Sequence, residues 1–157
     1  MPAEVGDKAP SFTLPTDDWD NMVSLGDYTK EGPVALEGPV ALFFYPGDWS
    51  SMCTHQIEKF QAEIGRFEER NASVLAISAD SPWSHRVFAE AEGIGFPILA
   101  DFERETIEDY SFKHERGFPE RAHFIDREGT IRAKRVEPST KDHPEAGAVL
   151  ADLDGAL

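Results

Sequence analysis

Apolar positions along the chain follow two periods, and each change of period marks a predicted element. Continuous apolar runs, typical of strands buried on both faces, occur at Val40–Tyr45, Ser73–Ser78 and Phe96–Ala100. Two shorter extended segments are predicted nearer the N-terminus, at Pro10–Leu14 and Met22–Leu25. The pattern therefore predicts a buried sheet preceded by N-terminal extended segments.

Helical spacing follows the first two buried strands. One amphipathic helix is predicted from Cys53 to about Asn71, and a second from the capping residue Ser81 to a stop at Gly93. The apolar positions of the first are Ile57, Phe60, Ile64 and Phe67. The residues expected on the buried face of the second are Trp83, Val87 and Ala91.

A hairpin and two further helices complete the pattern. Arg121–Ile125 and Thr130–Val136 flank the turn DREG, and helices are predicted at Glu103–Tyr110 and Pro144–Leu157. The order β, α, β, α, β, α, β, β, α predicts an α/β fold with a mixed central sheet flanked by helices. Because no linker interrupts it, we expect one domain spanning residues 1–157.

The composition adds a strongly acidic surface to this picture. Of the 157 residues, 40 % are hydrophobic, and the 3 Trp, 3 Tyr and 11 Phe argue against a disordered chain. Thirty acidic against 15 basic residues give a formal charge of −15, which repels nucleic acid and anionic membranes. We hypothesise a halophilic cytoplasm, where salt screens the repulsion between like charges.

The sequence gives three indications of compartment. Its N-terminus, MPAEVGDKAPSF, lacks the basic and apolar regions of a secretory signal. No apolar run approaches the roughly 20 residues that cross a bilayer. One cysteine cannot form an internal disulfide, so we expect a reducing cytoplasm.

The only cysteine lies in the stretch FYPGDWSSMCTHQ, Phe44–Gln56. A buried strand, a loop with Pro46 and Gly47, and a helix beginning near Cys53 place the thiol at a helix N-terminus, where free N–H groups and the helix dipole favour an anion. This matters because an ordinary cysteine, with a pKa of about 8.5, is mostly protonated at neutral pH. The alternative is a buried, unreactive cysteine.

The neighbours of Cys53 restrict its chemistry. A dithiol couple requires a second cysteine three positions later, where this chain has Gln56. One-thiol chemistry remains, namely attack on a peroxide, a disulfide or an acyl group. Acyl transfer additionally requires a histidine base and an oxyanion hole, and a sequence does not reveal their partners.

The pattern Pro46-x-x-x-Ser50-x-x-Cys53 resembles the active-site motif of the peroxiredoxins. The resemblance extends to VGDKAPSFTLP near the N-terminus, to AISADSPWSHRVFAE followed by FPILAD, and to RAHFIDREGTIR, which begins with Arg121. These four matching segments occur in the same order and are spread over nearly the whole chain, from Val5 to Arg132.

This resemblance implies a thioredoxin-like fold and the reduction of hydrogen peroxide or organic hydroperoxides without a metal or organic cofactor. It implies Cys53 as the peroxidatic nucleophile, Arg121 as the cation that favours its thiolate, Ser50 as a hydrogen-bond donor and Pro46 as a shield for the sulfur. The product would be a Cys53 sulfenic acid. It also implies a homodimer. The alternative on the same fold is a redox sensor or binding module that signals through a mixed disulfide.

Two positions depart from the family pattern. Ser50 stands where threonine is commoner, and Gln56 stands where many members have glutamate. Because a second cysteine is missing, the chain resembles the compact one-cysteine members of bacteria and archaea. The reductant is then external, either a low-molecular-weight thiol or a thioredoxin-like protein.

Overall fold

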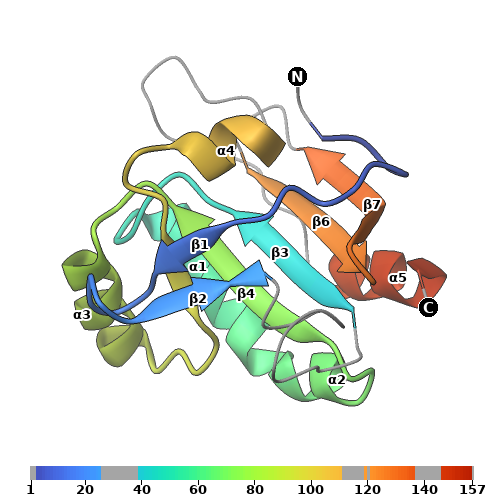
Figure 1. Cartoon of the computed structure of the whole chain (residues 1–157). Helices are drawn as coiled ribbons and strands as arrows, with labels where there is room; N and C mark the ends of the chain where they lie inside the picture. The colour runs from blue at the N-terminus through green and yellow to red at the C-terminus, as the bar shows by residue number, and fades with distance from the viewer. Residues whose placement is uncertain (1–2, 26–38, 111–118, 120, 137–145, 157) are drawn as a thin grey trace.

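The computed structural model describes residues 3–25, 39–110, 119, 121–136 and 146–156. They form a two-stranded N-terminal sheet and a five-stranded sheet in the order β5-β4-β3-β6-β7, with helices around it (Figure 1). The strands are β1 (Thr13–Pro15), β2 (Met22–Ser24), β3 (Val40–Phe44), β4 (Ser73–Ser78), β5 (Ile98–Ala100), β6 (Ala122–Arg127) and β7 (Thr130–Val136). The helices are α1 (Ser51–Ala62), α2 (Ile64–Glu68), α3 (Pro82–Glu92), α4 (Glu105–Tyr110) and α5 (Ala146–Ala156).

The main sheet is mixed, as the order of elements predicts. β3, β4 and β5 run parallel to one another, whereas β6 is antiparallel to both β3 and β7. β3 lies in the centre and all five of its residues are buried, which explains its uninterrupted apolar sequence. The carboxyl ends of β3 and β4 therefore meet at one edge of the sheet, where ligand sites of α/β proteins form.

Two apolar cores lie on opposite faces of this sheet. Alternate β3 residues divide between them, with Phe43 in one core and Phe44 in the other. The first core contains side chains of α1, α2, α3 and α5, and the second contains those of α4 and the N-terminal segment. Cys53 belongs to the first core, so its helix packs directly on the central strand.

Most predicted elements are present, and two predictions about the helices are wrong. The helix expected from Cys53 to Asn71 is interrupted at Glu63, where ψ reaches 7°, and continues as α2. The predicted buried face of α3 is also wrong, since Trp83 is 55 % and Val87 50 % exposed and Ala91 is exposed as well. The face that packs on the sheet carries Pro82, His85 and Phe88.

The reason for the rotated face of α3 lies in its contacts. Phe88 enters the first core. His85 is 1 % exposed, and its burial is tolerated because both ring nitrogens have hydrogen-bond partners. Trp83 instead contacts Trp19 of the N-terminal segment, with ring centroids 5.8 Å apart. Within the part of the chain that the structure describes, no helix has the length and apolar character needed to span a membrane.

Candidate functional site

The loop between β3 and α1 places the chain's only cysteine at the start of a helix. Ser50 has the extended backbone of an N-cap, with φ −65° and ψ 139°, and its Oγ accepts a hydrogen bond from the Cys53 amide at 3.2 Å. Cys53 thus lies in the first turn of α1, as the sequence predicts. The remaining free N–H groups of this turn and the helix dipole favour negative charge at this position.

A buried arginine faces the sulfur. Arg121, immediately before β6, is only 1 % exposed, and its Nη2 lies 3.1 Å from Cys53 Sγ. Its Nη1 donates to Oε1 of Gln56 at 2.8 Å. Cys53 is a free thiol that is itself fully buried.

The contact places a buried positive charge beside the sulfur. A guanidinium keeps its positive charge at every ordinary pH, and burying it is costly unless an anion or good acceptors lie beside it. In a low-dielectric interior the attraction between the Arg121 charge and a Cys53 thiolate is much stronger than in water. The buried Arg121 beside the sulfur therefore argues against an inert core cysteine, although the burial of Cys53 alone would be consistent with one.

The four residues predicted from the sequence differ in how closely they meet. The structure brings Cys53, Ser50 and Arg121 into direct hydrogen-bonded contact. Pro46 is half-buried at the start of the same loop. Gln56, which the family pattern marks only as a departure from glutamate, accepts a hydrogen bond from Arg121. It lies about one helical turn after Cys53, and this spacing could have indicated that both side chains face Arg121.

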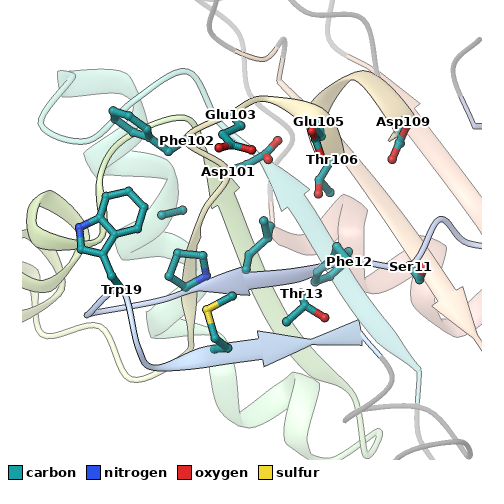
Figure 2. A pocket seen from close by; sticks show the side chains of 14 residues that line it. Ser11, Phe12, Thr13, Trp19, Asp101, Phe102, Glu103, Glu105, Thr106 and Asp109 are labelled. Atoms are coloured by element: carbon teal, nitrogen blue, oxygen red, sulfur yellow. The ribbon is translucent and has the colours of Figure 1, made fainter.

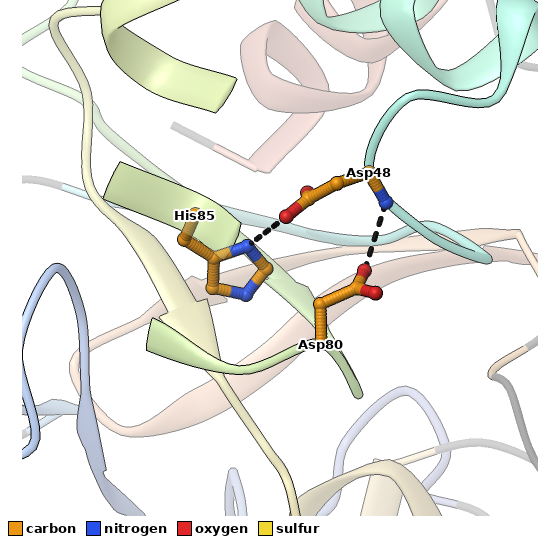
Figure 3. Close-up of side chains that lie close together, drawn as sticks. All are labelled: Asp48, Asp80 and His85. Atoms are coloured by element: carbon orange, nitrogen blue, oxygen red, sulfur yellow. Dashed lines mark hydrogen bonds and ion pairs between the residues drawn. The ribbon is translucent and has the colours of Figure 1, made fainter. Parts of the chain in front are cut away.

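A polar cluster beneath the loop was not predicted. Asp48, Asp80 and His85 lie together, and the atoms with which they could bind a cation are all within 4.8 Å of one another (Figure 3). Asp48 comes from the loop itself, Asp80 from the turn after β4 and His85 from α3. The sequence does contain a signal for this cluster, because Asp48 and Asp80 follow the parallel strands β3 and β4 at their carboxyl ends.

A cavity of about 640 Å³ lies elsewhere, between β1 and the segment from β5 to α4 (Figure 2). Trp19 and Phe102 line one end of it, and the carboxylates of Glu103, Glu105 and Asp109 lie along one side. None of the four predicted residues lines this cavity. The thiol chemistry is consequently separate from it.

Comparisons with known proteins agree with the site geometry. The sequence profile of the AhpC/TSA family matches residues 5–134. A Mycobacterium tuberculosis relative is 39 % identical over 102 residues, a match that spans 65 % of this chain and 60 % of the relative's length. The Bcp protein of Coxiella burnetii is 34 % identical over 162 residues, covering 98 % of this chain and 100 % of that protein.

A solved structure shows the same fold. The reduced 2-Cys peroxiredoxin of Plasmodium vivax superposes with a TM-score of 0.83 at 25 % identity, covering 96 % of this chain and 94 % of that one. The thioredoxin-like arrangement predicted from the sequence is thereby confirmed. This chain has a single cysteine, whereas that protein is a 2-Cys peroxiredoxin.

Proposed function

Because the chain belongs to the AhpC/TSA family of peroxiredoxins, we propose that it is a thiol-dependent peroxidase that reduces hydrogen peroxide or organic hydroperoxides at Cys53. The observation that carries this proposal is the 3.1 Å contact between the buried Arg121 guanidinium and the Cys53 sulfur. An inert core thiol does not require a buried cation beside it.

The proposed reaction begins with attack of the Cys53 thiolate on the terminal oxygen of the peroxide. The S–O bond forms as the O–O bond breaks, so the sulfur is oxidised to sulfenic acid and the peroxide is reduced. The leaving oxygen takes the electron pair and then a proton, giving water or an alcohol. Negative charge thus moves from the sulfur to the leaving oxygen during the step.

Four residues have roles in this proposed step. Arg121 stabilises the thiolate and then the leaving oxygen, while Gln56 holds its guanidinium in place. The Ser50 hydroxyl accepts a hydrogen bond from the Cys53 amide and donates one to the peroxide or to the sulfur. Pro46, at the entry to the loop, shields the sulfur from water.

An external thiol completes the cycle, since the chain offers no second cysteine. One thiol condenses with the sulfenic acid to give a mixed disulfide and water. A second thiol attacks the sulfur of the first, so that the two leave together as a disulfide and Cys53 is released as a thiolate. A low-molecular-weight thiol or a thioredoxin-like protein can serve. This requirement supports a reducing cytoplasm as the compartment.

We further propose a homodimer that uses an exposed aromatic surface formed by Trp19, Trp83 and Phe102. Their exposed fractions are 40 %, 55 % and 51 %, and Trp19 contacts both other rings at 5.7–5.8 Å. Contiguous apolar surface of this kind marks interaction sites. Sedimentation of Trp83→Glu should show a monomer, whereas Val5→Glu, beside β7 at the opposite edge of the sheet, should leave the dimer intact.

Turnover tests the proposed activity. With excess dithiothreitol and limiting protein, the wild type should consume many equivalents of hydrogen peroxide per chain, and Cys53→Ser should consume none above background. A redox sensor would instead consume about one equivalent and stop as a stable disulfide. Consumption that stops there would contradict the peroxidase proposal.

A further inference from the structure

The loop that precedes Cys53 is held from beneath by one fully buried carboxylate, that of Asp48. Its Oδ1 accepts a hydrogen bond from the Tyr45 hydroxyl at 2.6 Å. Its Oδ2 accepts from Ser84 Oγ at 2.8 Å. The same oxygen lies 2.7 Å from His85 Nδ1 (Figure 3). Both carboxylate oxygens are therefore bonded, Oδ1 to Tyr45 directly after β3 and Oδ2 to side chains of α3.

His85 has partners at both ring nitrogens. Its Nε2 lies 3.2 Å from the carbonyl oxygen of Leu99 and 3.4 Å from Ser78 Oγ. Its Nδ1 faces Oδ2 of Asp48, an oxygen that already accepts a proton from Ser84. A separation of 2.7 Å between Nδ1 and Oδ2 is that of a hydrogen bond. The pair is thus an imidazole ring hydrogen-bonded to a carboxylate, and both side chains are buried.

The tyrosine completes this arrangement as a donor. Burial, reinforced by the charge of Asp48 and its hydrogen bond, raises the pKa of Tyr45 well above its ordinary value. The hydroxyl therefore stays protonated and continues to donate to Asp48. The titratable groups that face His85 are Asp48 from the loop, Tyr45 after β3 and Asp80 from the β4–α3 turn.

The backbone of the loop is held as well. The Asp48 amide donates to Oδ2 of Asp80 at 2.8 Å, and the same oxygen accepts from Ser78 Oγ at 2.8 Å. A cation would have to displace these bonds and those of His85. The cluster therefore acts as a hydrogen-bonded clamp, which we define as Tyr45, Asp48, Asp80, Ser84 and His85, and its bonding leaves no ready ligand for a metal.

A strained residue shows that the loop depends on outside support. Trp49, directly after Asp48, has a φ of 68°, a left-handed conformation that costs a non-glycine residue about 1 kcal/mol or more. Trp49 is also 52 % exposed, with a ring contact to Phe88 of α3. Such a conformation persists only when the neighbouring structure fixes it, and here the bonds of Asp48 do so.

We propose that Asp48 and His85 are a buried positioning pair that fixes the loop from Pro46 to Ser50 and thereby sets the reactivity of Cys53 toward peroxide, without touching the peroxide. Asp48 of this pair lies two residues before Ser50, whose hydroxyl bonds the Cys53 amide and, in the proposed reaction, meets the reacting atoms. This inference rests on the proposed function, because it assigns the position of a donor in that reaction. Displacement of such a group by about 1 Å typically lowers a rate by about 100-fold.

The test compares three substitutions of His85 with a distant control. In His85→Asn the side-chain nitrogen occupies the place of Nδ1 and can still donate to Asp48, whereas in His85→Gln the donor occupies the place of Nε2. His85→Leu has neither donor. Ile107→Val, in the other core, loses about 1 kcal/mol of stability and leaves the loop alone.

Rapid mixing with hydrogen peroxide and alkylation by iodoacetamide are measured on folded protein. We expect His85→Leu and His85→Gln to oxidise at least about tenfold more slowly, with Asn within about fivefold of wild type and Ile107→Val unchanged. Alkylation, which does not use Ser50, should stay equal or rise as the loop loosens. Equal peroxide rates in His85→Leu and the wild type, an Asn variant no faster than Gln, or alkylation falling in parallel with oxidation would each overturn the positioning role.

Amide hydrogen exchange separates this inference from the proposed function. Exchange at residues 47–50 should be slow in the wild type and much faster in His85→Leu, whatever the peroxide rate. If the wild type reacts no faster than free cysteine, the peroxidase proposal fails. If the exchange of these amides is the same in both proteins, the clamp fails, irrespective of that rate.

Discussion

At the scale of single residues, we propose that the chemistry depends most on Arg121. It is a permanent charge with 1 % of its surface exposed, placed 3.1 Å from the sulfur. Removing it leaves the thiolate and the leaving oxygen without their cation. We expect Arg121→Ala to slow oxidation of Cys53 by hydrogen peroxide about 100-fold or more, measured by stopped-flow mixing.

Arg121→Lys and Arg135→Ala are the controls for this substitution. Lysine keeps the charge but loses the planar fork that reaches both Gln56 and Cys53, so its rate should fall between those of the wild type and the alanine variant. Arg135 is paired with Asp152 and half-exposed, and its loss should leave the rate unchanged. A wild-type rate in Arg121→Ala would refute the role of the guanidinium.

Asp126 offers a residue-scale prediction about stability. It is 1 % exposed on β6, and burial raises its pKa to about 7 although a 3.0 Å hydrogen bond from Tyr110 lowers it. Since the unfolded value is about 4, the folded state prefers the protonated form. This contribution to stability is complete below about pH 4 and is lost as the pH rises through 7.

Urea unfolding of the wild type and Asp126→Asn between pH 4.5 and 8 measures this effect. The free energy of unfolding of the wild type should fall relative to that of the variant by on the order of 1 kcal/mol per pH unit up to about 7. Other carboxylates titrate in both proteins and cancel in the difference. Parallel curves would show that Asp126 does not titrate as proposed.

At the scale of elements, the start of α1 matters because its N-cap, Ser50, is also a proposed site residue. Ser50 caps α1 and Ser81 caps α3 with the same 3.2 Å bond to the third amide of the helix. Each Ser→Ala change should lower the free energy of unfolding by about 1 kcal/mol. Only Ser50→Ala should also slow oxidation of Cys53, by at least about tenfold, because only its hydroxyl meets the reacting atoms.

Ser50→Thr provides the complementary result. Threonine keeps the hydroxyl and restricts its rotamer, so both the stability and the rate should stay close to those of the wild type. Thermal unfolding and stopped-flow mixing measure the two properties on the same samples. Equal slowing in Ser50→Ala and Ser81→Ala would mean that the cap affects the rate only through helix stability.

The elements also show how far sequence reasoning reaches. β4 and β7 agree with the sequence prediction residue by residue, since a buried strand leaves a continuous apolar run and a hairpin leaves a turn signal. The buried face of α3 could not be predicted, because two stripes with helical spacing compete on it. The stripe with more apolar residues, through Trp83 and Val87, is exposed, and the one through His85 is buried.

The site shows a similar division. Ser50 and Cys53 are near each other in sequence, so helix geometry alone brings them together. Arg121 is 68 positions from Cys53, and only the pairing of β6 with β3 brings it close, so its place came from family resemblance. The clamp joins three separate segments through side-chain bonds, which no local pattern encodes.

At the scale of the whole molecule, the dominant feature is a formal charge of −15. Mutual repulsion of like charges on a compact surface destabilises the folded state, and salt screens it over a distance that falls from about 10 Å at 0.1 M to 3 Å at 1 M. We therefore expect the melting temperature to rise by several degrees with KCl, mostly below about 1 M. A melting temperature that stays constant in KCl would count against a halophilic host.

The central claim is that Cys53 is an activated peroxidatic thiol, and its rate of oxidation tests this most directly. Reduced protein is mixed rapidly with hydrogen peroxide, quenched, and analysed by mass spectrometry for sulfenic acid at Cys53, beside free cysteine at the same pH. We predict oxidation at least about a thousandfold faster than that of free cysteine, since the cation, the helix start and the Ser50 hydroxyl act together. A rate equal to that of free cysteine would contradict the claim.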